Sequence, residues 1–155
     1  MTTKKEETSP RDRSKARIIE PNESPSTYDG ALLALAVAEA AWDMKARNVR
    51  VLDVRGMTSY TDFLVVCHGT SERHATSIAE HVVDELRPLK YRPIGIEGVA
   101  VGDWVLVDFG DVILHSFCDQ HRLEIPIESI FSDAPRMPLE PPPESEDPDF
   151  GKRRA

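Results

Sequence analysis

The sequence predicts a single α/β domain (α+β, mixed sheet) in which helices pack on a mixed β-sheet. Two observations predict it. Two segments have helical apolar spacing, and five strand-like runs are arranged around them in the order αββαβββ, followed by a short C-terminal helix. A chain of 155 residues, 40% hydrophobic and 30% charged, can bury one sizeable core. We therefore expect one folded domain at residues 27–136.

The two helical segments have recognisable starts and ends. The first covers residues 28–46, with apolar residues at helical spacing and Ser26, Thr27 or Asp29 available to cap it. The second follows Ser71, which can cap a helix whose positive end is next to Glu72. It buries one apolar stripe and ends before Pro88.

The strand-like runs cover residues 49–54, 62–67, 92–97, 104–108 and 112–117. The short, turn-rich linker at 55–60 favours an antiparallel pair for the first two runs. The tight turn at 109–111 predicts that the last two form a hairpin.

The two flanks differ from the core in composition. Residues 1–26 and 137–155 are rich in proline and charged residues, which predicts disordered tails. No apolar run is long enough for a membrane helix and the N-terminus lacks a secretory signal, while Glu6, Glu7 and Asp12 disfavour an organellar transit peptide. We expect a cytoplasmic protein without membrane contact, in which Cys67 and Cys118 stay reduced.

The predicted core is acidic. Residues 27–136 hold ten Lys or Arg against seventeen Asp or Glu, a net charge of −7. Such a surface repels nucleic-acid phosphates, so we expect no direct DNA binding. A basic protein surface is the more natural partner.

Several phrases carry a resemblance to a known family. They are VLDVRGMTSYTD at 51–62, GTSERH at 69–74, IAEHV at 78–82, GIEG at 95–98, DWVLVDFGDVILH at 103–115, and the segment 122–131. In order and spacing they resemble the Iojap family of ribosomal silencing factors over about residues 29–134.

This resemblance implies a nucleotidyltransferase-like α/β fold that is frequently a homodimer. It implies binding to large-subunit ribosomal protein fourteen on the intersubunit face, where the protein blocks the small subunit and represses translation. Occupying a surface requires no bond-making, so the resemblance implies no enzymatic activity and no cofactor. Assembly of the large subunit through the same docking site, known for organellar relatives, is the alternative.

Nucleotidyl transfer is the enzymatic rival. Such enzymes hold phosphates at a Gly-Ser turn and magnesium at an Asp-x-Asp pair. The turn from Gly69 to Ser71 could supply the first element, but the core has no Asp-x-Asp. Four aspartates at strand ends could still converge on a cation, and each is equally explained as a turn or capping residue: Asp53, Asp62, Asp108 and Asp111. The kinase-like Asp-Phe-Gly at 108–110 lacks a glycine-rich loop and is accidental.

Two groups of histidine and cysteine invite a metal hypothesis: Cys67, His68, His74 and His81, and Cys118 with His121. Neither contains His-x-x-x-His or Cys-x-x-Cys spacing, so we predict no metal site. His115 lies in an apolar run and is expected to be a hydrogen-bonded core histidine.

The candidate partner-binding residues are Trp104, Asp108, Ile125 and Glu128. We expect them to line a patch, apolar at the centre and acidic at the rim, that faces a basic ribosomal protein. The resemblance places the tryptophan strand near the partner. It also shows a departure, because Ile125 and Phe131 stand where relatives have tyrosine and tryptophan, and Pro126 begins the final helix.

Overall fold

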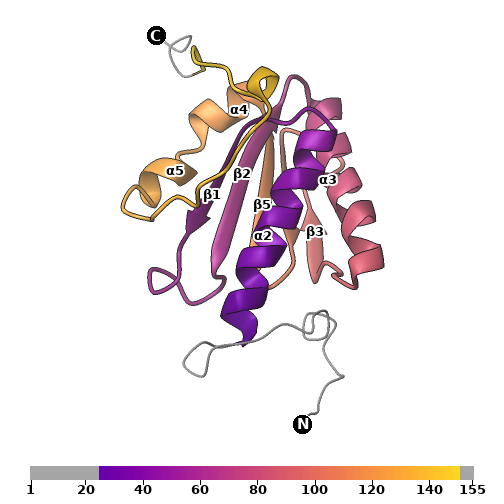
Figure 1. The fold of residues 1–155 in the computed structure, drawn as a ribbon. Helices are drawn as coiled ribbons and strands as arrows, with labels where there is room; N and C mark the ends of the chain where they lie inside the picture. Colours follow the sequence, from indigo (N-terminus) through magenta and orange to yellow (C-terminus); the bar gives the residue numbers. More distant parts are fainter. Residues whose placement is uncertain (1–24, 151–155) are drawn as a thin grey trace.

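The computed structural model describes residues 25–150, so residues 1–24 of the expected N-terminal tail lie outside the described part. Five strands form one sheet in the order β1-β2-β5-β4-β3 (Figure 1). They are β1 (Arg47–Asp53), β2 (Phe63–Gly69), β3 (Gly95–Glu97), β4 (Trp104–Asp108) and β5 (Val112–Cys118). β2 and β5 are parallel and all other neighbours are antiparallel. The mixed sheet confirms the predicted fold class.

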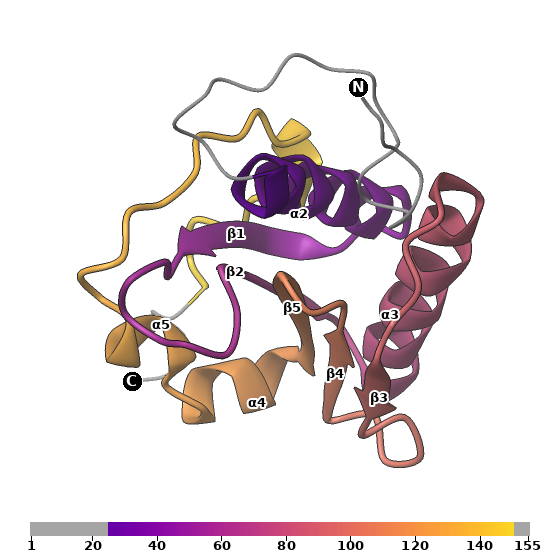
Figure 2. The ribbon, with the colours of Figure 1, turned by 90° about the horizontal axis from the view of Figure 1, so that it is seen from below.

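The helices lie on both sides of this sheet. Figure 2 shows α2 (Pro25–Asp43) and α3 (Glu72–Leu86) on one face, with the short helices α4 (Asp119–Glu124) and α5 (Ile127–Ile130) on the other. Two 3₁₀ turns, η1 (Arg87–Leu89) and η2 (Pro143–Ser145), complete the elements of residues 25–150. None of the helices in this range combines the length and apolar character needed to cross a bilayer.

The predicted pairings are confirmed, while several boundaries differ. β1 and β2 form the expected antiparallel pair, and β4 and β5 form the expected hairpin. Ser71 caps α3 as predicted, its side chain accepting a hydrogen bond from the His74 backbone N–H. The strand expected at 92–97 begins only at Gly95. The final helix expected from Pro126 is α5, while α4 before it was not predicted.

The first helix ends three residues before its predicted end. Lys45 adopts a left-handed conformation (φ 62°) and donates to the Trp42 carbonyl, while Ala46 donates to the Ala41 carbonyl. These two bonds form a Schellman motif, which usually has glycine at the left-handed position. Because a lysine occupies that position here, the sequence carries no glycine signal for the helix end.

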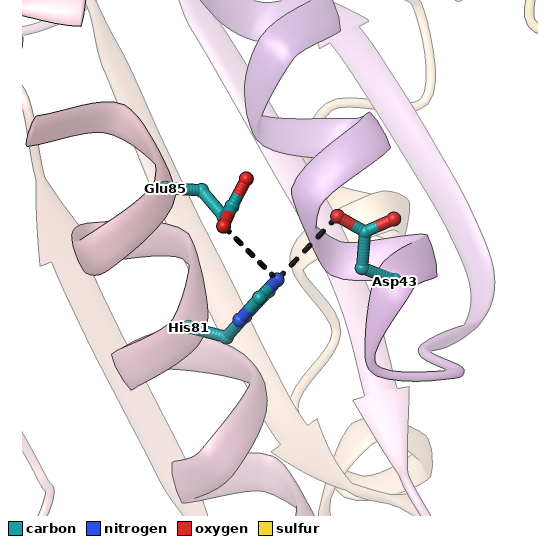
Figure 3. A group of neighbouring side chains, drawn as sticks. All are labelled: Asp43, His81 and Glu85. Atoms are coloured by element: carbon teal, nitrogen blue, oxygen red, sulfur yellow. Dashed lines mark hydrogen bonds and ion pairs between the residues drawn. The ribbon is translucent and has the colours of Figure 1, made fainter. Parts of the chain in front are cut away.

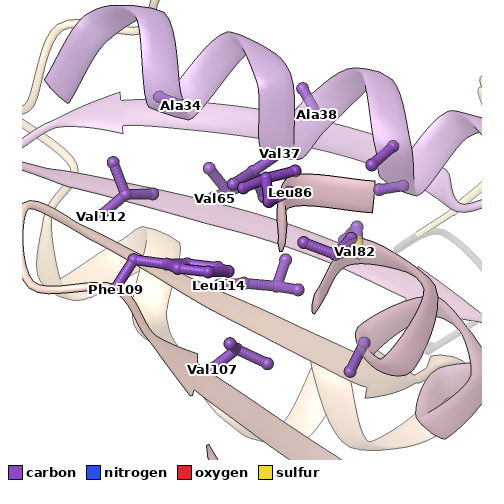
Figure 4. Packing of buried hydrophobic residues seen from close by; sticks show 14 of the residues in the cluster. Ala34, Val37, Ala38, Val65, Val82, Leu86, Val107, Phe109, Val112 and Leu114 are labelled. Atoms are coloured by element: carbon purple, nitrogen blue, oxygen red, sulfur yellow. The ribbon is translucent and has the colours of Figure 1, made fainter. Parts of the chain in front are cut away.

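The face of the sheet under α2 and α3, hereafter the closed face, carries the larger core. Its sheet side chains interdigitate with apolar residues of both helices (Figure 4), among them Val37 of α2, Val82 of α3 and Leu114 of β5, all fully buried. Burial on this scale contributes on the order of 25 cal/mol per Å² of apolar area. The closed face is therefore the main source of stability.

The opposite face, hereafter the open face, has a smaller buried cluster from β1, β2 and β5. It is covered by α4, α5 and the chain that follows them, and its buried residues are Leu52, Val54, Leu64, Val66, Ile113, Phe117, Ile127 and Ala134. α4 packs on β2 and β5. Two helices of six and four residues cannot seal a five-stranded sheet, so part of this face stays accessible.

The C-terminal segment differs from the disordered tail expected from residue 137. Residues 137–150 follow β1, and the Met137 backbone N–H donates to the Val51 carbonyl. The Asn48 side-chain amide exchanges two hydrogen bonds with the backbone of Asp147. Arg50 forms an ion pair with Glu146 through two hydrogen bonds. The reason is that β1 is an edge strand, and its outer backbone groups need partners. Residues 151–155 lie outside the described part.

Candidate functional site: the partly covered face of the sheet

An apolar patch lies on the open face beside α4 and α5. Trp104 and Leu106 reach it from β4, and Ile125 and Phe131 reach it from the helical segment. All four side chains are partly buried and pack against the buried cluster of the open face. Burial alternates along β4 because neighbouring side chains point to opposite faces, which places Trp104 and Leu106 opposite the closed-face core. We name these four residues the apolar patch.

Trp104 is held in one orientation by its neighbours on β5. Its indole Nε1–H donates to Nδ1 of His115 at 3.0 Å, and its ring stacks on Phe117 with centroids 5.4 Å apart. Because Nδ1 accepts this bond, neutral His115 carries its proton on Nε2. Burial lowers the pKa of His115 to about 4, so the imidazole is neutral at pH 7. His115 is thus the hydrogen-bonded core histidine that the sequence predicted, and it fixes a half-buried aromatic ring in advance of any contact.

Acidic side chains lie next to the apolar patch. His121 of α4 approaches Asp103 Oδ2 with Nε2 at 3.3 Å and Glu124 Oε1 with Nδ1 at 3.5 Å. Asp103 directly precedes Trp104 and Glu124 directly precedes Ile125, so His121 bridges the two ends of the patch. We name Asp103, His121 and Glu124 the acidic rim. The sequence analysis missed it, although each carboxylate is adjacent to a residue already singled out.

The structure places the four candidate partner-binding residues in different settings. Trp104 and Ile125 share the apolar patch. Asp108 is at the other end of β4, roughly 13 Å from Trp104 at about 3.3 Å per residue, where its carboxylate accepts from the Gly110 backbone N–H. Glu128 is bound to Arg122 at 3.1 Å and lies 3.8 Å from Arg136. Asp108 therefore lies away from Trp104 along β4, and the Glu128 carboxylate is engaged by two arginines.

Buried Arg122 positions the helices that carry Ile125. Its guanidinium pairs with Glu128, and its NH1 donates to the Arg47 carbonyl at 3.3 Å and to His68 Nδ1 at 2.9 Å. Burial lowers the pKa of Arg122, and the Glu128 charge opposes that shift. Truncating one partner of such a pair leaves an uncompensated buried charge. The pair therefore fixes α4 and α5 against β1 and β2.

A cleft of about 370 Å³ lies beside Arg122, between the sheet and the C-terminal segment. Three arginines line it, and each is near a carboxylate: Arg50 with Glu146, and Arg122 and Arg136 with Glu128. These carboxylates already neutralise the guanidinium groups that would attract an anion. The cleft is lined for internal ion pairs rather than for phosphate.

The turn that could hold nucleotide phosphates is filled by a side chain. His74 Nδ1 accepts from the Thr70 backbone N–H at 2.9 Å, and Nε2 is 2.7 Å from the Met44 carbonyl oxygen. A Cβ built on Gly69 would lie 2.7 Å from the His74 ring, so the imidazole occupies the space above this turn. The Ser71 hydroxyl is used as the helix cap. The turn from Gly69 to Ser71 connects β2 to α3, and His74 links it to the end of α2.

The four strand-end aspartates lie at one end of the sheet, as the topology of β1, β2, β5 and β4 requires. Asp53 is bound to Arg55 by two side-chain hydrogen bonds, which lower the pKa of its carboxyl group, and Asp108 caps its own turn. Within residues 25–150 these aspartates do not form a group with metal-ligand spacing, and neither of the two cysteine and histidine groups considered above forms one by itself. Burial raises the pKa of the Cys67 thiol to about 11, which keeps it protonated.

Together these features define a small α/β protein whose most distinctive surface is a half-covered apolar patch with an acidic rim. Comparison with known proteins places it in a family. The model of the family "Ribosomal silencing factor during starvation" matches residues 27–155. The chain therefore belongs to the ribosomal silencing factor family.

Individual relatives agree with this assignment. The chain is 36% identical over 109 residues to the ribosomal silencing factor RsfS of Halalkalibacterium halodurans, covering 70% of this chain and 92% of the relative. It is 32% identical over 90 residues to the mouse protein named mitochondrial assembly of ribosomal large subunit protein 1, covering 56% and 40%. A crystal structure of a Chromobacterium violaceum protein superposes with a TM-score of 0.64 at 28% identity, covering 72% of this chain and 89% of that one.

Proposed function

We propose that this protein docks on the large ribosomal subunit through the apolar patch and thereby blocks joining of the small subunit. The proposed contact is large-subunit ribosomal protein fourteen on the intersubunit face. The observation that carries the proposal is Trp104, an aromatic side chain that is half-buried and locked by His115 and Phe117. Aromatic anchors of this kind dominate binding energy at protein interfaces, and a fixed ring loses little entropy on binding.

The charge of the surface supports a basic partner. Asp103 and Glu124 are 35% and 61% exposed at the edge of the apolar patch, on a core with a net charge of −7. Rim charges accelerate the encounter of oppositely charged proteins, while the apolar centre sets the lifetime of the complex. Ile125 then contributes by apolar burial alone.

The mechanism is steric and requires no bond-making. A protein seated on the intersubunit face excludes the small subunit by its volume, so translation is repressed as long as the complex lasts. This proposal includes no catalytic residue and places the protein in the cytoplasm, where subunits join. The homodimer implied by the resemblance stays a prediction.

Binding to purified large subunits tests the docking surface. Replacing Trp104 by alanine should weaken binding by about 2 kcal/mol, because the fixed aromatic anchor is removed. Cosedimentation should then show a Kd that is roughly 30-fold higher. The matched control is Leu89→Ala, which removes a 51% exposed apolar side chain from η1, after α3. Circular dichroism would establish that both variants are folded. Equal affinities for the two variants would remove the apolar patch from the interface.

Assembly of the large subunit is a second candidate function, favoured by the name of the mouse relative. It uses the same surface but acts at an earlier stage. Depletion of the protein separates the two functions, because an assembly factor leaves immature large subunits to accumulate. A silencing factor instead leaves an excess of joined ribosomes during starvation. Sucrose-gradient profiles of depleted cells, with and without starvation, show which one dominates.

A further inference from the structure

Three potential metal ligands meet where the C-terminal end of α2 packs against α3. Asp43 is the last residue of α2, while His81 and Glu85 lie one turn apart on α3. Nε2 of His81 is 3.4 Å from Asp43 Oδ2 and 3.9 Å from Glu85 Oε2. In Figure 3 both carboxylates point at this same nitrogen, and all three ligand atoms lie within 4.8 Å of one another.

These separations suit a shared ion better than direct ion pairing. Charge-assisted hydrogen bonds between nitrogen and carboxylate oxygen measure about 2.7–2.9 Å. Two ligands bound tetrahedrally at about 2.0–2.2 Å from a zinc ion lie roughly 3.3–3.5 Å apart. The contact between His81 and Asp43 already matches such an edge. The carboxylate of Glu85 has to move closer to complete the set, because its Oε2 is 3.9 Å from His81 Nε2, and its side chain is flexible and 53% exposed.

The local charge also favours a cation. Asp43 lies at the negative end of the α2 dipole, and the last turn of α2 contains no basic residue. Asp43 and Glu85 place two carboxylates around His81. A divalent ion would balance the charge of both carboxylates.

The backbone beneath the three ligands is fixed before any ion arrives. α2 and α3 pack against each other. Ala41 of α2 and Val82 of α3, which are close in sequence to Asp43 and His81, are fully buried. His74 additionally holds the start of α3 to the end of α2 through the Met44 carbonyl. Three ligands on two anchored helices therefore lose little entropy when they bind an ion.

His121 provides an internal comparison. It too lies near two carboxylates, but Asp103 approaches its Nε2 and Glu124 approaches its Nδ1. The two ring nitrogens point in different directions, so these ligands cannot converge on one ion. Among residues 25–150, the group at His81 is the one with three ligand atoms in metal-binding proximity.

We propose that Asp43, His81 and Glu85 bind one divalent first-row transition-metal ion, of which Zn²⁺ is the best match. A nitrogen with two carboxylate oxygens suits Zn²⁺ better than Mg²⁺ or Ca²⁺, which take oxygen ligands. Water completes the coordination shell, because all three side chains are partly exposed. The bound ion clamps the end of α2 to α3. This departs from the sequence expectation of no metal, since Asp43 is distant in sequence and outside any spacing motif.

Titration of the metal-free full-length protein with Zn²⁺ tests the proposal by isothermal calorimetry. We expect one ion per chain, and a loss of at least tenfold in affinity for His81→Ala and for Asp43→Ala. His121→Ala is the matched control and should bind Zn²⁺ as the parent protein does. These positions are on the surface, so the variants should fold, and circular dichroism checks this.

A second readout links the ion to the helix clamp. Saturating Zn²⁺ should raise the Tm of the parent protein by preferential binding to the folded state, and His81→Ala should remove this rise. No binding, binding without a defined stoichiometry, or equal losses for His81→Ala and His121→Ala would each overturn the proposal. The Zn²⁺ assay contains no ribosome, so its outcome is independent of the docking proposed above.

Discussion

The two faces of the sheet differ in how completely they are covered. On the closed face, α2 and α3 extend over 19 and 15 residues and bury a continuous apolar layer (Figure 4). On the open face, α4 and α5 have six and four residues and leave Trp104, Leu106, Ile125 and Phe131 partly buried. The same apolar chemistry therefore serves two purposes. One face stabilises the monomer, and the other keeps apolar surface available for a partner.

A large-to-small substitution on each face should separate these purposes most strongly. Leu114→Ala on the closed face removes a fully buried side chain and should lower the free energy of unfolding by about 3 kcal/mol. Leu106→Ala on the open face removes a partly buried one and should cost about 1 kcal/mol. Urea denaturation measures both. Equal losses would mean that the open face is as important for stability as the closed face.

The pH dependence of stability should carry a second signature of the open face. The pKa of His115 is about 4 in the folded protein against about 6.5 in the unfolded chain. The contribution of His115 to the free energy of unfolding is fully present above pH 6.5 and is lost as the pH falls to 4. The reason is that only the unfolded chain takes up a proton at His115 in this window. The loss amounts to about 3 kcal/mol.

Comparison of the parent protein with His115→Gln measures this contribution. Glutamine can accept the Trp104 indole N–H but does not titrate, so its stability should fall less between pH 6.5 and pH 4. Chemical denaturation at several pH values gives both curves. Parallel curves for the two proteins would show that folding does not lower the pKa of His115.

A smaller effect is expected at the start of α3 on the closed face. Ser71→Ala removes the side-chain acceptor of the His74 backbone N–H and should cost about 1 kcal/mol. Ser71→Asp keeps an acceptor and a favourable charge at the helix start, so it should retain most of the stability. Thermal unfolding of the three proteins ranks them. An alanine variant as stable as the parent would show that the cap is not needed.

The smallest effect is expected at the edge strand β1. Glu146→Gln weakens a partly exposed ion pair with Arg50 and should cost about 0.5 kcal/mol or less. Glu144→Gln, in the exposed part of the same segment, is the matched control. Limited proteolysis should cleave residues 137–150 faster in the first variant than in the second. Identical cleavage rates would show that the pair does not hold the segment.

Much of the fold was predictable because its signals are local. β4 was predicted with its observed ends, since Gly102 and Gly110 punctuate a run of strand-forming residues. The end of α2 was not, because Lys45 takes the left-handed position usually given to glycine. The order along residues 137–150 was not predictable either. It depends on the free edge of β1, which exists only once the sheet has formed.

The candidate site, like the fold, could be predicted from the sequence only in part. Trp104 and Ile125 were identified from the sequence, and they do share one surface. Asp108 and Glu128 were chosen for their charge, but Asp108 caps its own turn, the alternative that the sequence also offered, and Glu128 binds Arg122, a contact that sequence spacing does not reveal. Tertiary contacts decide which carboxylates stay available. The acidic rim at Asp103 and Glu124 depends on His121 in the same way.

The central claim is that the open face works by occupying the surface where two ribosomal subunits meet. The most direct measurement is light scattering of purified small and large subunits as they associate, with the protein in saturating excess. The account predicts that the parent protein and Leu89→Ala suppress association, while Trp104→Ala requires roughly 30-fold more protein for the same suppression. Subunits that associate equally fast with and without the parent protein would contradict it.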